Sequence, residues 1–407
     1  MSGQIGLASA AMFFAALACA VPSLASDGPE DVVHDPGTFY GGPKDIYLFA
    51  ETPGRWSVDK ARKWYAKQPW LVGVNFVPST AVNDVEMWQA QSFDPTTMER
   101  ELGWAHGLGF NTVRVFVNYA VWDADAEGLK RRFDQFLSIS AKLGIRVMPV
   151  LLFGCDAKHS DAHVGPQPAP VPGVHNSRWV ESLPPMVIKA DGTEEWSPKA
   201  ERYIKDMVGT FGRDERVVIW DLYNEPAQRK CIPFVEATFR WAREVDPVQP
   251  LASVWLAEPY SDLVNLHEYG PLDKPLTWRY EENGKAGKIT FHAMGPTILN
   301  AEKAGRPVIV SEWMARDFDS KFETHLPFMK SRKVSCWSWG LVAGRTQTYL
   351  WWDGKPGSPP PTVWHHDILR KDGTPYSEYE ASTIRYYTGI DKRFPAAPLG
   401  QSSTGAQ

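Results

Sequence analysis

The sequence lacks the features that mark several large classes of protein. It contains no long basic run, and its 43 Lys and Arg residues are outnumbered by 48 Asp and Glu residues, which gives a net charge of -5 at neutral pH. Nucleic-acid-binding proteins carry a basic patch or stripe, so no nucleic-acid partner is expected. Charged residues make up 22% and apolar residues 43% of the chain, a balance typical of globular proteins and unlike that of disordered ones.

Long apolar runs are also scarce. Residues 5–21 form a mostly apolar, uncharged segment that is short for a membrane span, and Ser23 and Ala25 flank a small-x-small cleavage motif. This pattern predicts a signal peptide over residues 1–25 and a secreted or periplasmic protein. A lipid anchor on Cys19 is the alternative. No second apolar run of spanning length follows, so no membrane span is expected.

Cysteine is rare, with four residues in the whole chain. Removal of a signal peptide leaves three, so at least one has no partner within the chain. Cys336 lies in an apolar, strand-like run and is expected to be a buried thiol. Cys155 and Cys231 each follow the end of a predicted strand, and we predict a disulfide between them.

The chain alternates apolar, strand-like runs with amphipathic helical segments, which indicates α/β architecture with a parallel sheet. Helix signals include Asp94 followed by Pro95, a typical cap and first position. The eight expected strands are residues 71–76, 112–117, 145–153, 217–222, 251–256, 263–269, 307–312 and 334–340. Eight strand–helix units predict a single-domain (β/α)8 TIM barrel over residues 40–394, with a disordered tail over 395–407.

The sixth strand has two candidates. Residues 278–291 are expected to form an inserted hairpin, because Asn283-Gly284 is a turn signal between β-prone runs. Residues 289–294 are the alternative sixth strand. Two long irregular segments, 156–191 and 342–367, follow the ends of the third and eighth strands. They are expected on the C-terminal face, where barrel enzymes build their sites.

Two glutamates stand at strand ends. Glu225 follows the fourth strand within Asn224-Glu225-Pro226, and Glu312 ends the seventh. Carboxylates at the C-terminal ends of nonadjacent strands face each other across the barrel mouth, and glycoside hydrolysis requires such a pair. Arg114 shares a face of the second strand with Phe116. A buried arginine needs an anionic partner, and Glu312 is the candidate.

A division of roles follows from this arrangement. A neighbouring cation would keep Glu312 ionised, as a nucleophile requires. Glu225 would feel that negative charge and hold its proton, as a general acid requires.

The motifs around Arg114, Glu225, Glu312 and Trp339 together resemble glycoside hydrolase clan A, and most of all glycoside hydrolase family 5. The wider text over residues 65–390 is similar to a bacterial branch labelled cellulase-like or 1,4-β-xylanase. The resemblance implies that Glu225 is the acid/base and Glu312 the nucleophile of a retaining mechanism. It also implies supporting or substrate-binding roles for Arg114, Asn224, His267, Tyr269, Trp339, Asn75 and Trp88.

Within this set, Asn224 matches the residue that binds the sugar 2-hydroxyl, and Trp339 matches the platform under the reacting sugar. His267 and Tyr269 match a His-x-Tyr pair on the sixth strand, for which His292 is a competing candidate. Trp88 is a candidate for stacking on sugar at the rim of the groove.

We therefore expect a secreted retaining β-glycoside hydrolase that acts on a polysaccharide of the xylan, mannan or β-glucan type. Cleavage inside the chain is favoured, but the sequence leaves open whether the enzyme cleaves inside the chain or at its ends. Two alternatives use the same groove, namely carbohydrate binding without turnover and glycosyl transfer to a sugar acceptor. The chemistry needs no metal or cofactor, so none is expected. The oligomeric state stays open.

Overall fold

The structure is a computed structural model. It describes residues 52–154, 162–184, 186–188, 194–196, 198–226, 231–282 and 285–396. The predicted signal peptide, Cys19, Cys155 and nearly all of the predicted tail lie outside these ranges. The signal peptide, the lipid anchor, the Cys155–Cys231 disulfide and the tail therefore stay predictions.

Eight parallel strands form a nearly closed barrel, which confirms the (β/α)8 fold. Each strand pairs with the next along the ring, β12 pairs with β1, and β7 and β8 end the hydrogen-bonded order. The strands are β1 (Val72–Asn75), β2 (Thr112–Phe116), β3 (Arg146–Phe153), β6 (Trp220–Asn224), β7 (Leu251–Ala252), β8 (Val264–His267), β11 (Val308–Trp313) and β12 (Ser335–Trp339).

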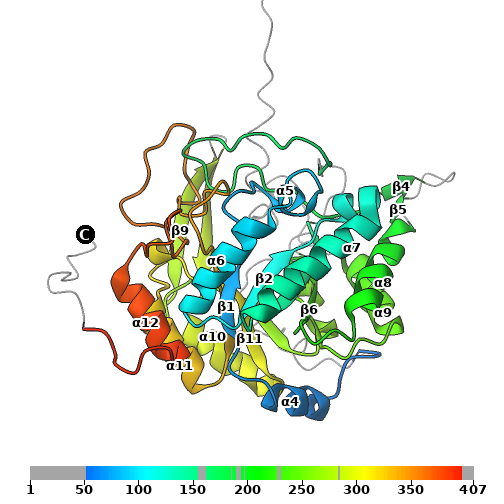
Figure 1. The fold of residues 1–407 in the computed structure, drawn as a ribbon. Helices are drawn as coiled ribbons and strands as arrows, with labels where there is room; N and C mark the ends of the chain where they lie inside the picture. Colours follow the sequence, from blue (N-terminus) through cyan, green and yellow to red (C-terminus); the bar gives the residue numbers. More distant parts are fainter. Residues whose placement is uncertain are drawn as a thin grey trace, which may run out of the picture.

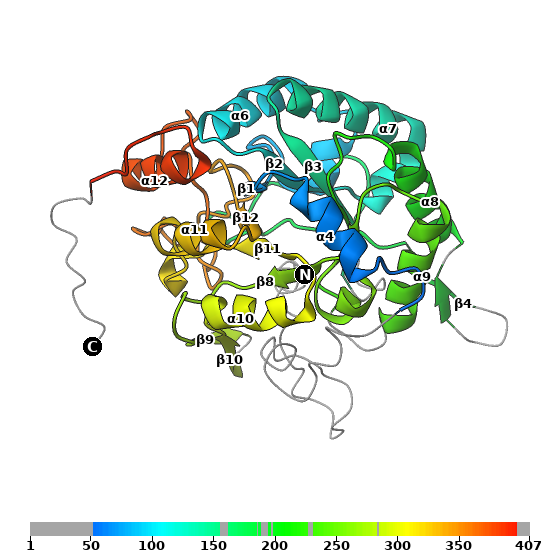
Figure 2. The same cartoon turned by 90° about the horizontal axis from the view of Figure 1, so that it is seen from below.

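Helices surround the barrel, as Figure 2 shows from below. Their bounds are α4 (Val58–Ala66), α5 (Asp84–Trp88), α6 (Pro95–Gly107), α7 (Tyr119–Lys142), α8 (Lys199–Phe211), α9 (Ile232–Glu244), α10 (Met294–Ala301), α11 (Phe322–Ser331) and α12 (Glu378–Thr388). Helix α6 begins as the sequence predicts, because the Asp94 side chain accepts a hydrogen bond from the Thr97 backbone N–H and Pro95 fills the first position.

The inserted hairpin is confirmed. Strands β9 (Leu276–Glu282) and β10 (Lys285–Phe291) pair antiparallel in a sheet of their own, outside the barrel. The barrel's sixth strand is β8, so the alternative over residues 289–294 is wrong. A second antiparallel pair, β4 (Met186–Ile188) and β5 (Glu194–Trp196), follows β3, where the sequence pattern predicts an irregular segment as far as residue 191.

The fifth strand is shorter than the sequence predicts. Strand β7 ends at Ala252, and a 3-10 helix, η2 (Trp255–Tyr260), replaces the rest of the expected strand 251–256. The backbone of Trp255 has a φ of 55°, which is incompatible with an extended strand. Pro259 lacks the N–H that a continued strand ladder needs.

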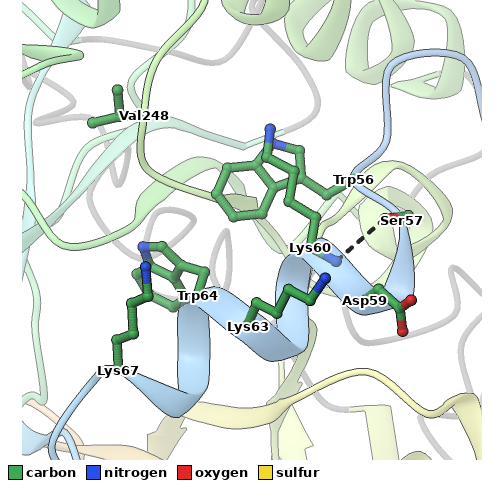
Figure 3. Close-up of a pocket in the computed structure, with 8 residues that line it drawn as sticks. All are labelled: Trp56, Ser57, Asp59, Lys60, Lys63, Trp64, Lys67 and Val248. Carbon is green, nitrogen blue, oxygen red and sulfur yellow. Dashed lines mark hydrogen bonds between the residues drawn. The ribbon is translucent and has the colours of Figure 1, made fainter.

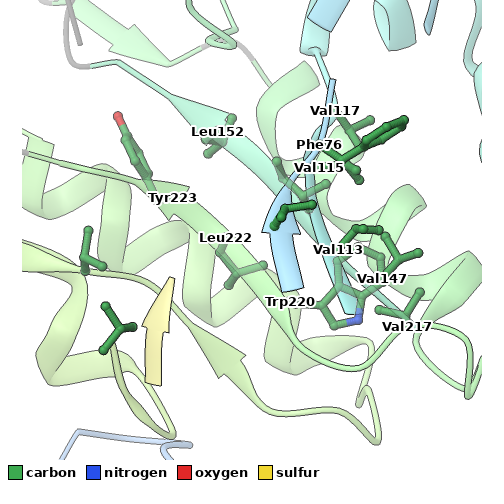
Figure 4. Packing of buried hydrophobic residues seen from close by; sticks show 14 of the residues in the cluster. Phe76, Val113, Val115, Val117, Val147, Leu152, Val217, Trp220, Leu222 and Tyr223 are labelled. Atoms are coloured by element: carbon green, nitrogen blue, oxygen red, sulfur yellow. The ribbon is translucent and has the colours of Figure 1, made fainter. Parts of the chain in front are cut away.

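Strand alternation explains where the core and the site lie. In β2, Val113 and Val115 face outward and pack under the helices with Trp220 and Leu222 of β6 (Figure 4). Arg114, between the two valines, therefore points into the barrel. Cys336 is buried in β12, as expected, and burial raises the pKa of its thiol.

Helix α4 covers the N-terminal end of the barrel (Figure 2). Trp56 and Tyr65 pack there on Met148, Ile309 and Trp337, which fill the lower barrel interior. The interior is therefore closed at this end, and access to the strand ends is from the C-terminal face.

Candidate active site

Glu225 and Glu312 meet at the C-terminal ends of β6 and β11. One carboxylate oxygen of Glu225, one carboxylate oxygen of Glu312 and one ring nitrogen of His267 all lie within 4.8 Å of one another. Glu225 has a φ of 47°, in the left-handed region that a non-glycine residue rarely adopts. Such backbone strain concentrates at functional sites, and here it accompanies the turn that aims the glutamate across the barrel mouth.

Arg114 binds the nucleophile candidate, as the sequence predicts. The guanidinium is fully buried, and its Nη1 lies 2.7 Å from Glu312 Oε1. The other nitrogens contact Asp221 Oδ2, with Nε at 3.0 Å and Nη2 at 2.8 Å. One cation thus stands between two carboxylates, and the hydrogen bonds fix it in a single orientation.

Two amides complete the arginine's surroundings. Arg114 Nη1 donates to Asn75 Oδ1 at 2.7 Å, and Nη2 donates to Asn224 Oδ1 at 2.6 Å. Asn75 also donates from Nδ2 to the carbonyl of Ser311 at 2.9 Å. Asn75 therefore positions Arg114, and it is itself buried with 1% of its surface exposed.

Glu312 receives two further hydrogen bonds on its second oxygen. The Tyr269 hydroxyl donates to Oε2 at 2.7 Å, and the Trp339 indole N–H donates to the same oxygen at 2.8 Å. Burial raises the pKa of Glu312, whereas the charge of Arg114 and these two donors lower it, and that pKa lies below its ordinary value. The carboxylate is therefore ionised at neutral pH.

His267 lies between the two glutamates. Its Nδ1 is 2.8 Å from Glu225 Oε1 and its Nε2 is 2.8 Å from Ser311 Oγ. Burial lowers the pKa of His267 to about 3, so the imidazole is neutral at neutral pH. The permanent positive charge that keeps Glu312 ionised is therefore that of Arg114.

Sequence reasoning missed two members of this network, Asp221 and Ser311. A signal for Asp221 exists in hindsight, because a charged residue within a buried strand needs a partner, as does Arg114. Ser311 carries no such signal, since a serine in a strand is common.

Trp88 does not lie in the site, and the prediction that it stacks on sugar is wrong. Its side chain has no exposed surface and packs against Phe133 and Phe136 beneath α7. Its indole N–H donates to the backbone carbonyl of Phe116. The competing histidine, His292, follows β10 of the hairpin, whereas His267 ends barrel strand β8.

Trp339 is half-buried beside Glu312 and has aromatic neighbours on several sides. The ring centroids of Phe116 and Trp179 each lie 6.0 Å from that of Trp339, and the ring of His366 lies 6.4 Å away. Neither Trp179 nor His366 is marked by any local sequence pattern.

A hollow of about 470 Å³ lies beside α4 (Figure 3). Trp56 and Trp64 line it together with three lysines, and Lys60 sits 4.1 Å from the ring centre of Trp56. It belongs to the N-terminal end of the barrel and contains no pair of carboxylates, so it is not the site of the chemistry. Within the described ranges, no helix combines the length and apolar character needed to cross a membrane.

The sequence matches the family described as cellulase, glycosyl hydrolase family 5, over residues 79–345. The chain belongs to glycoside hydrolase family 5. It is therefore a glycoside hydrolase, and the expected family is confirmed. No curated protein matches this family 5 hydrolase.

Solved structures that are similar to this family 5 hydrolase include three glycosidases. A GH5_18 enzyme of Streptomyces cattleya in complex with Manβ1-4GlcNAc has a TM-score of 0.48 and 11% identity, with 79% of this chain and 80% of that chain covered. A family 5 mannosidase of Rhizomucor miehei has a TM-score of 0.45 and 14% identity, with 79% and 93% covered. An endo-β-1,4-mannanase of Thermotoga petrophila has a TM-score of 0.49 and 11% identity, with 80% and 78% covered.

Proposed function

We propose that this family 5 hydrolase is secreted and cleaves β-O-glycosidic bonds of a polysaccharide with retention of configuration. The polysaccharide is of the xylan, mannan or β-glucan type. The observation that carries the proposal is the short distance between Glu225 and Glu312. One carboxylate oxygen of Glu225 lies within 4.8 Å of one carboxylate oxygen of Glu312. Retaining enzymes hold their two carboxyl groups about 5–5.5 Å apart, whereas inverting enzymes leave about 6.5–9.5 Å for a water.

The first step uses both glutamates. Glu312 Oε attacks the anomeric carbon, and Glu225 donates its proton to the leaving glycosidic oxygen as the bond to that oxygen breaks. Arg114 and the donors Tyr269 and Trp339 support this role, because they hold Glu312 as an anion. The product of the step is a glycosyl ester of Glu312.

The second step reverses the roles. Glu225, now a carboxylate, takes a proton from a water that attacks the anomeric carbon, and Glu312 leaves as a carboxylate. His267 supports both protonation states of Glu225, because a neutral imidazole nitrogen either donates to a carboxylate or accepts from a carboxylic acid. Asn224 is held by Arg114 through its oxygen, which leaves its amide nitrogen to bind the sugar 2-hydroxyl.

Labelling with a 2-fluoro glycosyl inactivator tests the assignment. The expected result is a covalent adduct on Glu312, found by mass spectrometry of proteolytic peptides. An adduct on another residue, or none with any sugar that serves as a substrate, contradicts the mechanism. Glu225→Ala provides the matched test of the acid: it should keep formation of the adduct from substrates with good leaving groups and lose cleavage of polysaccharides.

Product analysis separates the remaining alternatives. Carbohydrate binding without any turnover indicates a binding protein. New, longer glycosides formed when an acceptor sugar is present indicate a transglycosylase, because the covalent step is shared.

A further inference from the structure

Two loops join above the C-terminal face of the barrel. Residues 162–184 follow β3 and residues 342–367 follow β12, and we call the pair the loop bridge. Backbone hydrogen bonds connect them, from Asn176 N to Thr346 O and from Gly357 N to Pro172 O, each 2.8 Å long. The two loops approach each other at the top of the molecule in Figure 1.

Side chains tie the loop bridge more tightly. Gln347 Nε2 donates to the carbonyls of Val171 at 2.8 Å and Val174 at 3.0 Å. His175 Nδ1 lies 2.7 Å from the carbonyl oxygen of Leu350. Because both loops are held through their backbones, the loop bridge is a fixed wall.

The course of the loop bridge passes over the ends of β1 and β2. Residues 162–184, which lie between β3 and β6 in the sequence, contact the connection that follows β1 on their course toward the loop after β12. Gly165 exchanges two hydrogen bonds with the Gln89 side chain, and Asn83 Nδ2 donates to Gln167 Oε1 and to the Arg178 carbonyl. The wall therefore covers the four neighbouring strand ends β3, β2, β1 and β12.

A second wall continues this one over β11 and β8. The hairpin β9–β10 packs Trp278 against Phe318 and Trp352, with ring centroids 5.7 and 5.8 Å apart. Trp352 belongs to the loop bridge and also contacts Tyr269 at 5.1 Å. The walls thus meet beside the residues that hold Glu312.

Aromatic residues of the loop bridge pack against Trp339 on this side. Trp179 and His366, both from the loop bridge, are in ring contact with Trp339. Glu225 follows β6, which ends at Asn224 and is not one of the four strands whose ends the loop bridge covers. Among the described residues, the loop bridge therefore bounds the mouth behind Trp339.

The direction of a sugar chain in this site follows from the chemistry, and the argument rests on the proposed function. The leaving group lies on the side of the acid Glu225, at the end of β6. The sugar that is transferred to Glu312 lies against Trp339, which donates to the same carboxylate. Any further sugars on its non-reducing side would have to pass through the loop bridge.

We propose that the enzyme removes single sugars from the non-reducing end of its β-linked substrate. The loop bridge blocks further sugars on the non-reducing side of the site, so that the remainder of the chain leaves on the side of Glu225. The sequence favours cleavage inside the chain but leaves the cleavage mode open, and the proposal takes the other mode.

Oligosaccharides labelled at the reducing end test the cleavage mode. Manno-, xylo- and cello-oligosaccharides of several lengths are digested, and the products are separated at early times. The expected result is a labelled product one unit shorter than the substrate, together with free monosaccharide. Labelled products of all lengths, or a disaccharide as the first small product, overturn the proposal while leaving the two-glutamate chemistry intact.

A blocked substrate provides a test that needs no variant. An oligosaccharide whose terminal 4-hydroxyl carries a bulky ether is expected to resist cleavage completely, while the unblocked oligosaccharide is cut. Equal cleavage of both overturns the proposal. Failure to cleave any aryl glycoside or oligosaccharide, with no adduct on Glu312, is a separate result that refutes the proposed function and this inference together.

Trp179→Ala tests the wall directly. Loss of the indole opens space beside Trp339, so release of disaccharides from the non-reducing end is expected to rise relative to monosaccharide. Trp364→Ala is the matched control: it removes another tryptophan of the loop bridge, which stacks on Tyr376 at 4.8 Å, away from Trp339. Identical product ratios in folded Trp179→Ala and wild type overturn the proposal, and the blocked substrate decides if Trp179→Ala does not fold.

Discussion

The hydrogen bond from Tyr269 to Glu312 makes a quantitative prediction about pH. Tyr269→Phe removes only the hydroxyl that donates to Oε2 at 2.7 Å and keeps the ring that packs on Trp352. A buried hydrogen bond to a charged group contributes about 1.5–3 kcal/mol. One unit of pKa corresponds to about 1.4 kcal/mol, so the pKa of Glu312 in the free enzyme is expected to rise by roughly one to two units.

The assay is the pH profile of kcat/KM, whose acid limb reports the group that must be ionised in the free enzyme. In Tyr269→Phe this limb is expected to move toward neutral pH, with activity at its own optimum less affected than activity at low pH. A limb that stays at the wild-type position, with a uniform loss of activity, refutes the view that Tyr269 acts by keeping Glu312 ionised.

Measurements of unfolding stability test the same hydrogen bond between Tyr269 and Glu312 independently. Because the pKa of Glu312 is held below its ordinary value, the carboxylate contributes stability above its unfolded pKa and loses it as pH falls through the folded pKa. Tyr269→Phe should therefore unfold more easily at neutral pH, and the difference should shrink in acid. Tyr203→Phe is the control, since its buried hydroxyl donates to backbone carbonyls, and it should lower stability without moving the acid limb.

Two further predictions concern buried residues. Trp88→Ala is expected to lower the free energy of unfolding by about 3–5 kcal/mol, because the indole is a core residue; a stable variant with a raised KM in its place would restore the sugar-stacking role. Burial raises the pKa of Asp367 to about 7, so the unfolded state releases this proton at a lower pH, and the contribution of Asp367 to stability falls as pH rises from about 4 to 7. Asp367→Asn should reduce that fall by roughly 1–3 kcal/mol in denaturant titrations, and an unchanged slope would show that Asp367 is ionised in the folded protein.

Much of the fold is encoded locally. Alternating apolar residues and helical periodicity extend over a few residues at a time, so they locate strands such as β2 and β3 and the start of α6 at Asp94. The turn signal at Asn283-Gly284, between β-prone runs, likewise predicts a hairpin. The fifth strand is shorter than its apolar run predicts, because such a run does not reveal the positive φ of Trp255.

The sequence also identifies the two glutamates, because a carboxylate at the end of an apolar strand is unusual. A barrel brings the C-terminal ends of all its strands to one face, so the two glutamates are expected to lie near each other. Arg114 and Glu312 are paired by the cost of burying a lone charge. The sequence therefore predicts which two carboxylates form the proposed catalytic pair.

Only the tertiary structure decides what surrounds those groups. Asp221 meets Arg114, and Trp179 and His366 meet Trp339, across long stretches of chain that no local pattern connects. The burial of Trp88 depends on how α5 and α7 pack, so the sequence alone does not show whether this tryptophan lies in the core or at the rim of the site. The loop bridge likewise consists of two loops that meet only when the barrel has closed, because the hydrogen bonds between their backbones join residues that are far apart in the sequence.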